Sequence, residues 1–261
     1  MKRIGIVPVS GGAGAGFVMA MLATELAAVK SAGSVNVHDG VAGMGPGEIT
    51  AVELGRGNLF DQLCADRWFR VRQMVSYWNC VHSGGQVERI INPRCGVNWF
   101  LRTPEDRVGL EDVDEEDGPA GGNLERGRAV KLLYSLPGDV AFVDFSSVNE
   151  AELFYLLEDM DQIVVVVDPL PSKLLGGYER ICRMKLWKKP VIWTMNRWTG
   201  QIDVKELRKV MGSEGRWVTL PEIPRELLHQ GEYSGCGFIE HQQIRRAMAP
   251  GMEEIIRRLR I

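Results

Sequence analysis

The sequence predicts an α/β fold, a three-layer, doubly wound structure with a predominantly parallel sheet between helices. Two observations carry this prediction. Four short runs are apolar without alternation, as strands buried on both faces are: residues 4–9, 140–145, 162–167 and 190–194. Segments with helical periodicity separate these runs, and strands that alternate with helices of this length form βαβ units.

The other elements follow in chain order. Weaker strand patterns are found at 49–54 and 216–220, and helical patterns at 17–30, 125–135, 150–158, 174–186, 204–210 and 252–260. We interpret the chain as one domain, 1–261, with an insertion at about 59–122. The aromatic part of this insertion is expected to pack as helices over one end of the sheet. Its acidic, Gly/Pro-rich part, residues 111–122, is expected to be a surface loop.

Composition narrows the function classes. The 261 residues are 45% hydrophobic and 25% charged, which is enough for one large core. A net charge of −3 gives no global basic field for nucleic acid. The five cysteines are widely spaced, with no CxxC motif or Cys/His ligand pair, and no apolar run reaches the ~20 residues of a membrane span. We therefore expect a soluble, cytoplasmic protein with reduced thiols.

A glycine-rich loop separates the first strand from the first helix. A phosphate needs backbone N–H groups that point inward and a helix N-terminus that complements its charge, and glycines permit both. The segment "GGAGAGF" has this composition at the required place, so we take its residues as candidate nucleotide contacts: Gly11, Gly12, Ala13, Gly14, Ala15, Gly16 and Phe17. The alternative is a tight turn that binds nothing.

This loop resembles the deviant Walker A motif of the MinD/ParA family of P-loop ATPases, KGGxGK[ST]. The segment "SGGAGAG" keeps the three glycines of that motif. Ser10 takes the place of the signature lysine, Ala15 that of the P-loop lysine, and Gly16 that of the magnesium-binding hydroxyl. The resemblance implies the family's fold and a site for ATP or ADP with Mg²⁺.

The resemblance continues along the chain in the family's order. In "ITAVELGRGNLF", Glu53 stands at the family's first acid and Gly55 at its catalytic aspartate. "VAFVDFSS" is similar to the Walker B strand, so Asp144 is the implied Mg²⁺ or water contact; its alternative role is a helix cap. "VIWTMNRWTG" and "WVTLPEIP" are similar to the last two strands, so Asn196 and Pro221 are implied to lie on the adenine side.

The departures from the family motif predict little or no hydrolysis. Lysine, magnesium-binding hydroxyl and catalytic acid all support phosphoryl transfer, and this sequence lacks all three, so we assign no catalytic residue. Binding can persist through backbone amides and the helix dipole. Three cations near strand ends are candidates for a substitute charge: Arg56, Lys173 and Arg197.

Within the family, the chain is most similar to the TadZ/CpaE-like branch, through "VELG", "MDQIVVVVDPLPSKLLGGYERI" and "GEYSGC". That similarity implies a regulatory or localisation factor, a homodimer, and protein partners from a pilus, secretion or positioning machine. Two alternatives stay open: an active ATPase in partitioning or positioning, and a scaffold that binds no nucleotide. For the C-terminal helix, docking on the sheet is favoured over membrane contact, and for Trp68, Phe69, Tyr77 and Trp78 a core position is favoured over a partner surface.

Overall fold

A computed structural model describes residues 1–33, 49–55, 57–72, 76–82, 84–104, 106, 126–212 and 217–261. The predicted acidic loop at 111–122 and Arg56 lie outside the described residues. Phe69 lies in a described helix, but its side chain is not described.

One sheet runs through the described part of the chain, and its eight strands lie in the order β3-β4-β2-β5-β1-β6-β7-β8. The strand pairs are parallel except for β3 with β4. This arrangement confirms the predicted α/β class. The strands are β1 Lys2–Pro8, β2 Ile49–Glu53, β3 Pro93–Arg94, β4 Val97–Phe100, β5 Val140–Asp144, β6 Gln162–Val167, β7 Val191–Trp198 and β8 Val218–Pro221.

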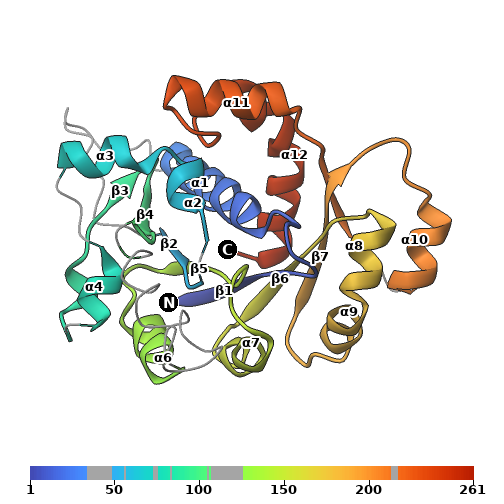
Figure 1. The fold of residues 1–261 in the computed structure, drawn as a ribbon, viewed down its shortest axis with the longest axis horizontal. Coiled ribbons are helices and arrows are strands. Elements are labelled where there is room, and N and C mark those ends of the chain that lie inside the picture. Colours follow the sequence, from blue (N-terminus) through green and yellow to red (C-terminus); the bar gives the residue numbers. More distant parts are fainter. Residues whose placement is uncertain are drawn as a thin grey trace.

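Helices cover both faces of the sheet (Figure 1). They are α1 Ala15–Gly33, α2 Leu59–Gln62, α3 Ala65–Arg72, α4 Tyr77–His82, the 3₁₀ turn η1 Val87–Arg89, α6 Arg126–Ser135, α7 Glu150–Leu157, α8 Pro171–Gly176, α9 Tyr178–Lys185, α10 Val204–Met211, α11 Arg225–Ser234 and α12 Gln242–Leu259. The central strand shows why two layers form. In β1, Ile4 and Ile6 join the apolar cluster of α1 and α12, whereas Val7 joins that of α6, α7 and α9, because alternate side chains leave opposite faces.

Helix α1 packs between the sheet and α12. Its stretch Ala15–Ala32 has a mean hydropathy of 1.3, so length and composition alone would let it cross a membrane. In the fold, Met19, Leu22 and Leu26 are buried in the core. Helix α12 docks on α1 and β8 with Met252 and Ile255 buried, which confirms the favoured interpretation of the C-terminal segment.

The insertion differs from the prediction of helices alone. It contains helices, but it also contributes β3 and β4, which extend the sheet beyond β2. Strand β4 is buried on both faces: Trp99 packs in the cluster of α1, and Phe100 in that of α6 and α7. Trp68, Tyr77 and Trp78 are buried too, so the core interpretation of these aromatics is confirmed.

Two helices have other bounds than predicted. The expected helix 174–186 is two helices, α8 and α9, which meet at Gly177. A Cβ on Gly177 would lie 2.6 Å from the Val9 oxygen, so this junction touches the end of the central strand. The last helix begins at Gln242 rather than 252, and Pro250 lies inside it although proline normally disfavours a helix interior. Helix α11 has no counterpart among the predicted elements.

Candidate functional site

The glycine-rich loop lies where β1 leads into α1, at the carboxyl edge of the parallel strands. Gly12 has φ +75° and Gly14 has φ +86°, a backbone conformation that other residues rarely adopt. The Ala13 N–H donates to the Ser10 oxygen (3.2 Å), and the Val18 N–H donates to the Gly14 oxygen (3.0 Å) as α1 begins. The sequence therefore folds locally into a turn that ends at a helix N-terminus, as a phosphate cradle requires.

Two side chains from distant elements hold this loop. Asn196 on β7 is buried, and its Nδ2 donates to the Ala13 oxygen (2.9 Å). Lys173 on α8 donates from Nζ to the Gly11 oxygen (2.8 Å). A Cβ on Gly14 would lie only 2.5 Å from the Asn196 Nδ2, so the glycine is needed for this contact as well as for its φ. The loop is fixed from two sides.

The loop residues fit a phosphate in part. The Ser10 hydroxyl is buried and has no hydrogen-bond partner among the described residues, which leaves a polar group beside the cradle for a ligand or water. Ala13 and Ala15 are buried in the core cluster. Phe17 packs against Phe238 with ring centroids 4.6 Å apart, so its ring serves packing and its predicted contribution would come from the backbone.

Asp144 ends β5 with a side chain that is almost fully buried. Its Oδ1 accepts hydrogen bonds from the Ser146 N–H (2.9 Å) and Oγ (2.5 Å). Burial raises the pKa of this carboxyl to about 6, although the hydrogen bonds from Ser146 lower it. Its Oδ2 lies 3.0 Å from the point where a Cβ on Gly16 would stand, next to the loop.

This position suits the predicted magnesium contact, and the alternative of a helix cap is wrong. Asn149 caps α7 instead, because its side chain accepts from the Glu152 N–H (2.9 Å). Asp144 reaches the start of α1, where the family's Mg²⁺-binding hydroxyl would be. Among the described residues no group of three or more His, Cys, Asp or Glu could hold a metal ion.

A side chain at Gly55, which the resemblance aligns with the family's catalytic acid, would overlap Ser147. A Cβ on Gly55 would lie 2.5 Å from the Ser147 Cβ and 2.6 Å from its carbonyl carbon, both far inside van der Waals contact. The acid two residues earlier, Glu53, is buried, and its carboxylate accepts hydrogen bonds from the backbone. Its Oε1 accepts from the Leu59 N–H (3.0 Å) at the start of α2, and its Oε2 from the Arg102 N–H (3.4 Å).

The predicted adenine-side residues follow two neighbouring strands. Asn196 lies in β7, and Pro221 ends β8, where it pairs with Trp198. The structure places the Asn196 amide on the loop, and the contact of Asn196 and Pro221 with adenine stays a prediction. Arg197, one of the three candidate cations, forms an ion pair with the buried Asp168 (2.8 Å). Asp168 also accepts a hydrogen bond from the Leu170 N–H (3.1 Å), so it shapes a turn.

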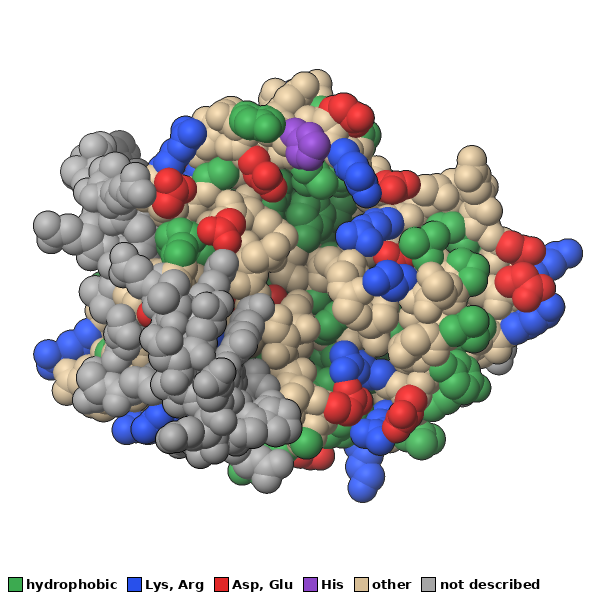
Figure 2. All heavy atoms as spheres, in the orientation of Figure 1, with side chains coloured by type: hydrophobic (Ala, Val, Ile, Leu, Met, Phe, Trp, Pro, Cys, Tyr) green, Lys and Arg blue, Asp and Glu red, His purple; other side chains and the backbone are tan. Residues whose placement is uncertain are grey.

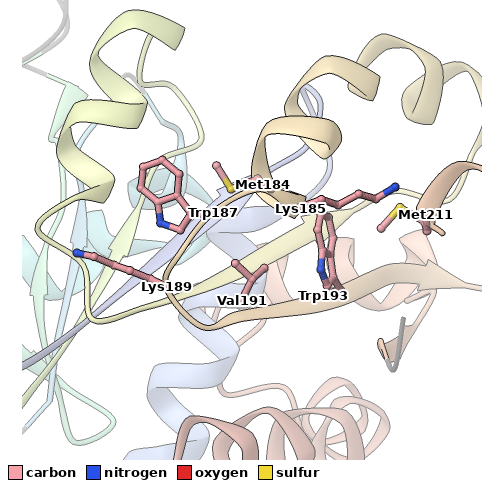
Figure 3. A pocket seen from close by; sticks show the side chains of 7 residues that line it. All are labelled: Met184, Lys185, Trp187, Lys189, Val191, Trp193 and Met211. Carbon is pink, nitrogen blue, oxygen red and sulfur yellow. The ribbon is translucent and has the colours of Figure 1, made fainter. Parts of the chain in front are cut away.

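The face that carries this site is hollowed near its centre, and Lys and Arg side chains gather on one side of the hollow (Figure 2). A separate cavity of about 160 Å³ lies between α9, β7 and α10 (Figure 3). Its lining comes mainly from Trp187, Trp193, Met184 and Met211. Val191, which begins β7, also lines it, so the cavity is at the amino edge of the sheet, away from the loop.

Sequence reasoning missed the roles of two residues. The contact of Ser147 with Gly55 and the role of Asn196 as a support for the loop carry no local signal, because each joins residues far apart in the chain. The preference for glycine at positions 12 and 14 did have a signal, since both precede a helical pattern.

No family model matches the sequence, and no curated protein matches it. Solved structures do. A ParA family ATPase from Chlorobium tepidum TLS has a TM-score of 0.60 and 19% identity, covering 90% of this chain and 89% of that chain. The septum site-determining protein MinD of Pyrococcus horikoshii OT3, complexed with Mg-ADP, has a TM-score of 0.64 and 16% identity, covering 97% and 95%. MinD in the MinC:MinD cell division protein complex of Aquifex aeolicus has a TM-score of 0.63 and 13% identity, covering 98% and 96%. From its sheet, its loop and these likenesses, the chain has the fold of the MinD/ParA P-loop ATPases.

Proposed function

We propose that this protein is a degenerate MinD/ParA-like nucleotide-binding protein that acts as a regulatory or localisation factor and hydrolyses ATP slowly or not at all. One combination of observations supports the proposal: the glycine-rich loop has positive φ at Gly12 and Gly14 and ends at a helix N-terminus, while a side chain at Gly55 would overlap Ser147. The two features separate binding from hydrolysis.

Support for binding comes from the loop. Gly12 and Gly14 keep positive φ values, and Asn196 fixes the Ala13 carbonyl so that the neighbouring N–H groups are preorganised. The MinD structure from P. horikoshii is complexed with Mg-ADP, so a protein of this fold can bind a nucleotide. We propose ATP or ADP as the ligand, with Asp144 as the protein contact of an accompanying Mg²⁺.

Support for weak hydrolysis comes from three positions. Ala15 has no positive charge to stabilise the phosphates, and Gly16 has no hydroxyl to bind a metal ion. Gly55 has no carboxylate to orient the attacking water. Removal of a single electrostatic donor costs about 10²–10³ in rate in well-studied enzymes. With all three missing, binding rather than turnover is the property that remains.

The biological role is proposed from resemblance. The similarity to the TadZ/CpaE-like branch supports action in the cytoplasm as a homodimer that positions a pilus or secretion machine. The MinD of A. aeolicus was solved in complex with MinC, so a protein partner is compatible with this fold. An active ATPase for partitioning is disfavoured by the closed position at Gly55.

Titration calorimetry with ATP and ADP, each with and without Mg²⁺, tests the proposal. Gly14→Ala is the decisive variant, because its Cβ would meet the Asn196 Nδ2 at 2.5 Å and its φ of +86° is strained. Gly127→Ala in α6 is the control, since a Cβ on Gly127 would meet nothing within 4 Å and Gly127 is not part of the proposed site. We expect micromolar binding in the wild type and in Gly127→Ala, and at least tenfold weaker binding in Gly14→Ala.

The outcomes separate the alternatives. Absence of heat and of a thermal shift at millimolar nucleotide in the wild type would refute the proposal and leave a scaffold protein. Binding with fast phosphate release would instead support the active ATPase. Wild-type affinity in a folded Gly14→Ala protein would show that the Asn196 contact does not organise the site.

A further inference from the structure

Lys173 places an ammonium group on the phosphate loop from outside it. The residue lies on α8, and its Nζ donates to the Gly11 oxygen at 2.8 Å. The same Nζ lies 3.8 Å from the point where a Cβ on Gly12 would stand. The positive charge therefore borders both of the glycines that open the cradle.

The segment that carries Lys173 is anchored to the strand that leads into the loop. At the junction of α8 and α9, a Cβ on Gly177 would lie 2.6 Å from the Val9 oxygen, so the two backbones are in direct contact. Three residues later, Arg180 donates from Nη1 to the Pro8 oxygen (2.8 Å) and forms an ion pair with Glu150. These contacts fix the direction from which α8 approaches the loop.

The other described candidate for a substitute cation is used elsewhere. Arg197 forms an ion pair with Asp168, whose side chain is fully buried, at 2.8 Å. If the Arg197 guanidinium moved away, the Asp168 carboxylate would stay buried without its charge partner, at a large cost in free energy. Arg197 is therefore held in the ion pair. Among the described residues, the neutral Gly11 carbonyl is the one hydrogen-bond partner of the Lys173 ammonium, which can therefore turn toward an anion at small cost.

We propose that Lys173 supplies in cis the positive charge that meets the terminal phosphates of the nucleotide, in place of the lysine that Ala15 replaces. This inference rests on the proposed nucleotide binding. An ammonium has three donors, so one N–H can stay on the Gly11 oxygen while another donates to a phosphate oxygen. Because the charge comes from α8, α1 can keep a small, buried Ala15 in the core.

The proposal predicts selectivity by phosphate number. An ammonium near the β- and γ-phosphates contributes to the binding of ATP and ADP, and little to that of AMP, which lacks those groups. Charge-assisted hydrogen bonds are about twice as strong as neutral ones, so loss of the ammonium corresponds to roughly 10- to 100-fold in affinity.

The test is calorimetric titration of the full chain with ATP, ADP and AMP. Lys173→Met removes the charge and keeps a similar stem, and Lys173→Arg keeps the charge. Lys188→Met is the matched control, because Lys188 is an exposed lysine before β7, at the opposite edge of the sheet. We expect Lys173→Met to weaken ATP and ADP roughly 10- to 100-fold and AMP less than about twofold, with Lys173→Arg intermediate and Lys188→Met unchanged.

Each of the other outcomes would overturn either the role of Lys173 or nucleotide binding as a whole. Wild-type protein that binds ATP, with Lys173→Met binding equally well, overturns the role of Lys173 and leaves the proposed function intact. Equal losses for ATP and AMP show that Lys173 only braces the loop, which also overturns it. Wild-type protein that binds no nucleotide overturns both proposals.

Discussion

Replacement of Asp144 by Asn is expected to stabilise the metal-free, nucleotide-free protein at neutral pH. The carboxyl is almost fully buried, and burial raises its pKa from 3.8 to about 6. Only the hydrogen bonds from Ser146 act against that rise, and they do not restore the usual value. The charged form is therefore less favourable in the folded than in the unfolded chain.

The magnitude follows from linkage between protonation and folding. Each pKa unit corresponds to about 1.4 kcal/mol, so a rise of about 2 units destabilises the charged folded state by about 3 kcal/mol. Because the pKa of Asp144 is higher in the folded than in the unfolded chain, ionisation of this carboxyl lowers the free energy of unfolding. The cost is absent below about pH 4, where both states are protonated, grows between about pH 4 and 6, and is complete above about pH 6.

Urea unfolding of wild type and Asp144→Asn, in EDTA at several pH values, measures this effect. An asparagine Oδ1 can still accept from the Ser146 N–H, so the neutral side chain keeps the hydrogen bond without the charge. We expect the variant to be more stable by up to about 3 kcal/mol at pH 7.5 and close to wild type at pH 4. Asp139→Asn, at an exposed carboxyl one residue before β5, is the control and is expected to change little.

Two results would contradict this account. A variant that is less stable than wild type at pH 7.5 would mean that the Asp144 carboxylate has a stabilising partner in the protein. A gain in stability that is equal at pH 4 and 7.5 would mean that the effect comes from packing and not from ionisation.

Two further predictions concern the loop and its surroundings. Gly55→Asp, which introduces the acid that the family resemblance implies at this position, is expected to destabilise the fold by about 1–3 kcal/mol, because its Cβ would overlap Ser147. Urea unfolding measures this, with Gly176→Ala as a control whose Cβ would meet nothing within 4 Å. An unchanged midpoint in Gly55→Asp would show that the backbone at Ser147 yields. Asn196→Asp, which replaces the donor to the Ala13 oxygen by an acceptor of equal size, is expected to cost about 1–3 kcal/mol and to weaken ATP binding in calorimetry. Wild-type affinity in a folded Asn196→Asp protein would show that this hydrogen bond does not organise the loop.

Local patterns in the sequence were sufficient for the central strands. Strands β1, β5 and β6 were found within about two residues because they are apolar on both faces, which is a property of their own residues. Strands β3 and β4 were missed for the opposite reason. They are two and four residues long, and they are strands only because β4 pairs with β2 across the sheet.

What the sequence by itself determined is the class of the fold and the place of the glycine-rich loop between the first strand and the first helix. These follow from residue identity and periodicity, which act over a few neighbours. Only the tertiary structure decided that Ser147 closes the position at Gly55, that burial raises the pKa of Asp144, and that Lys173 reaches Gly11 across 162 positions of sequence. Contacts of this kind depend on how distant elements pack, and desolvation depends on everything that surrounds a group, so neither can be read from neighbouring residues.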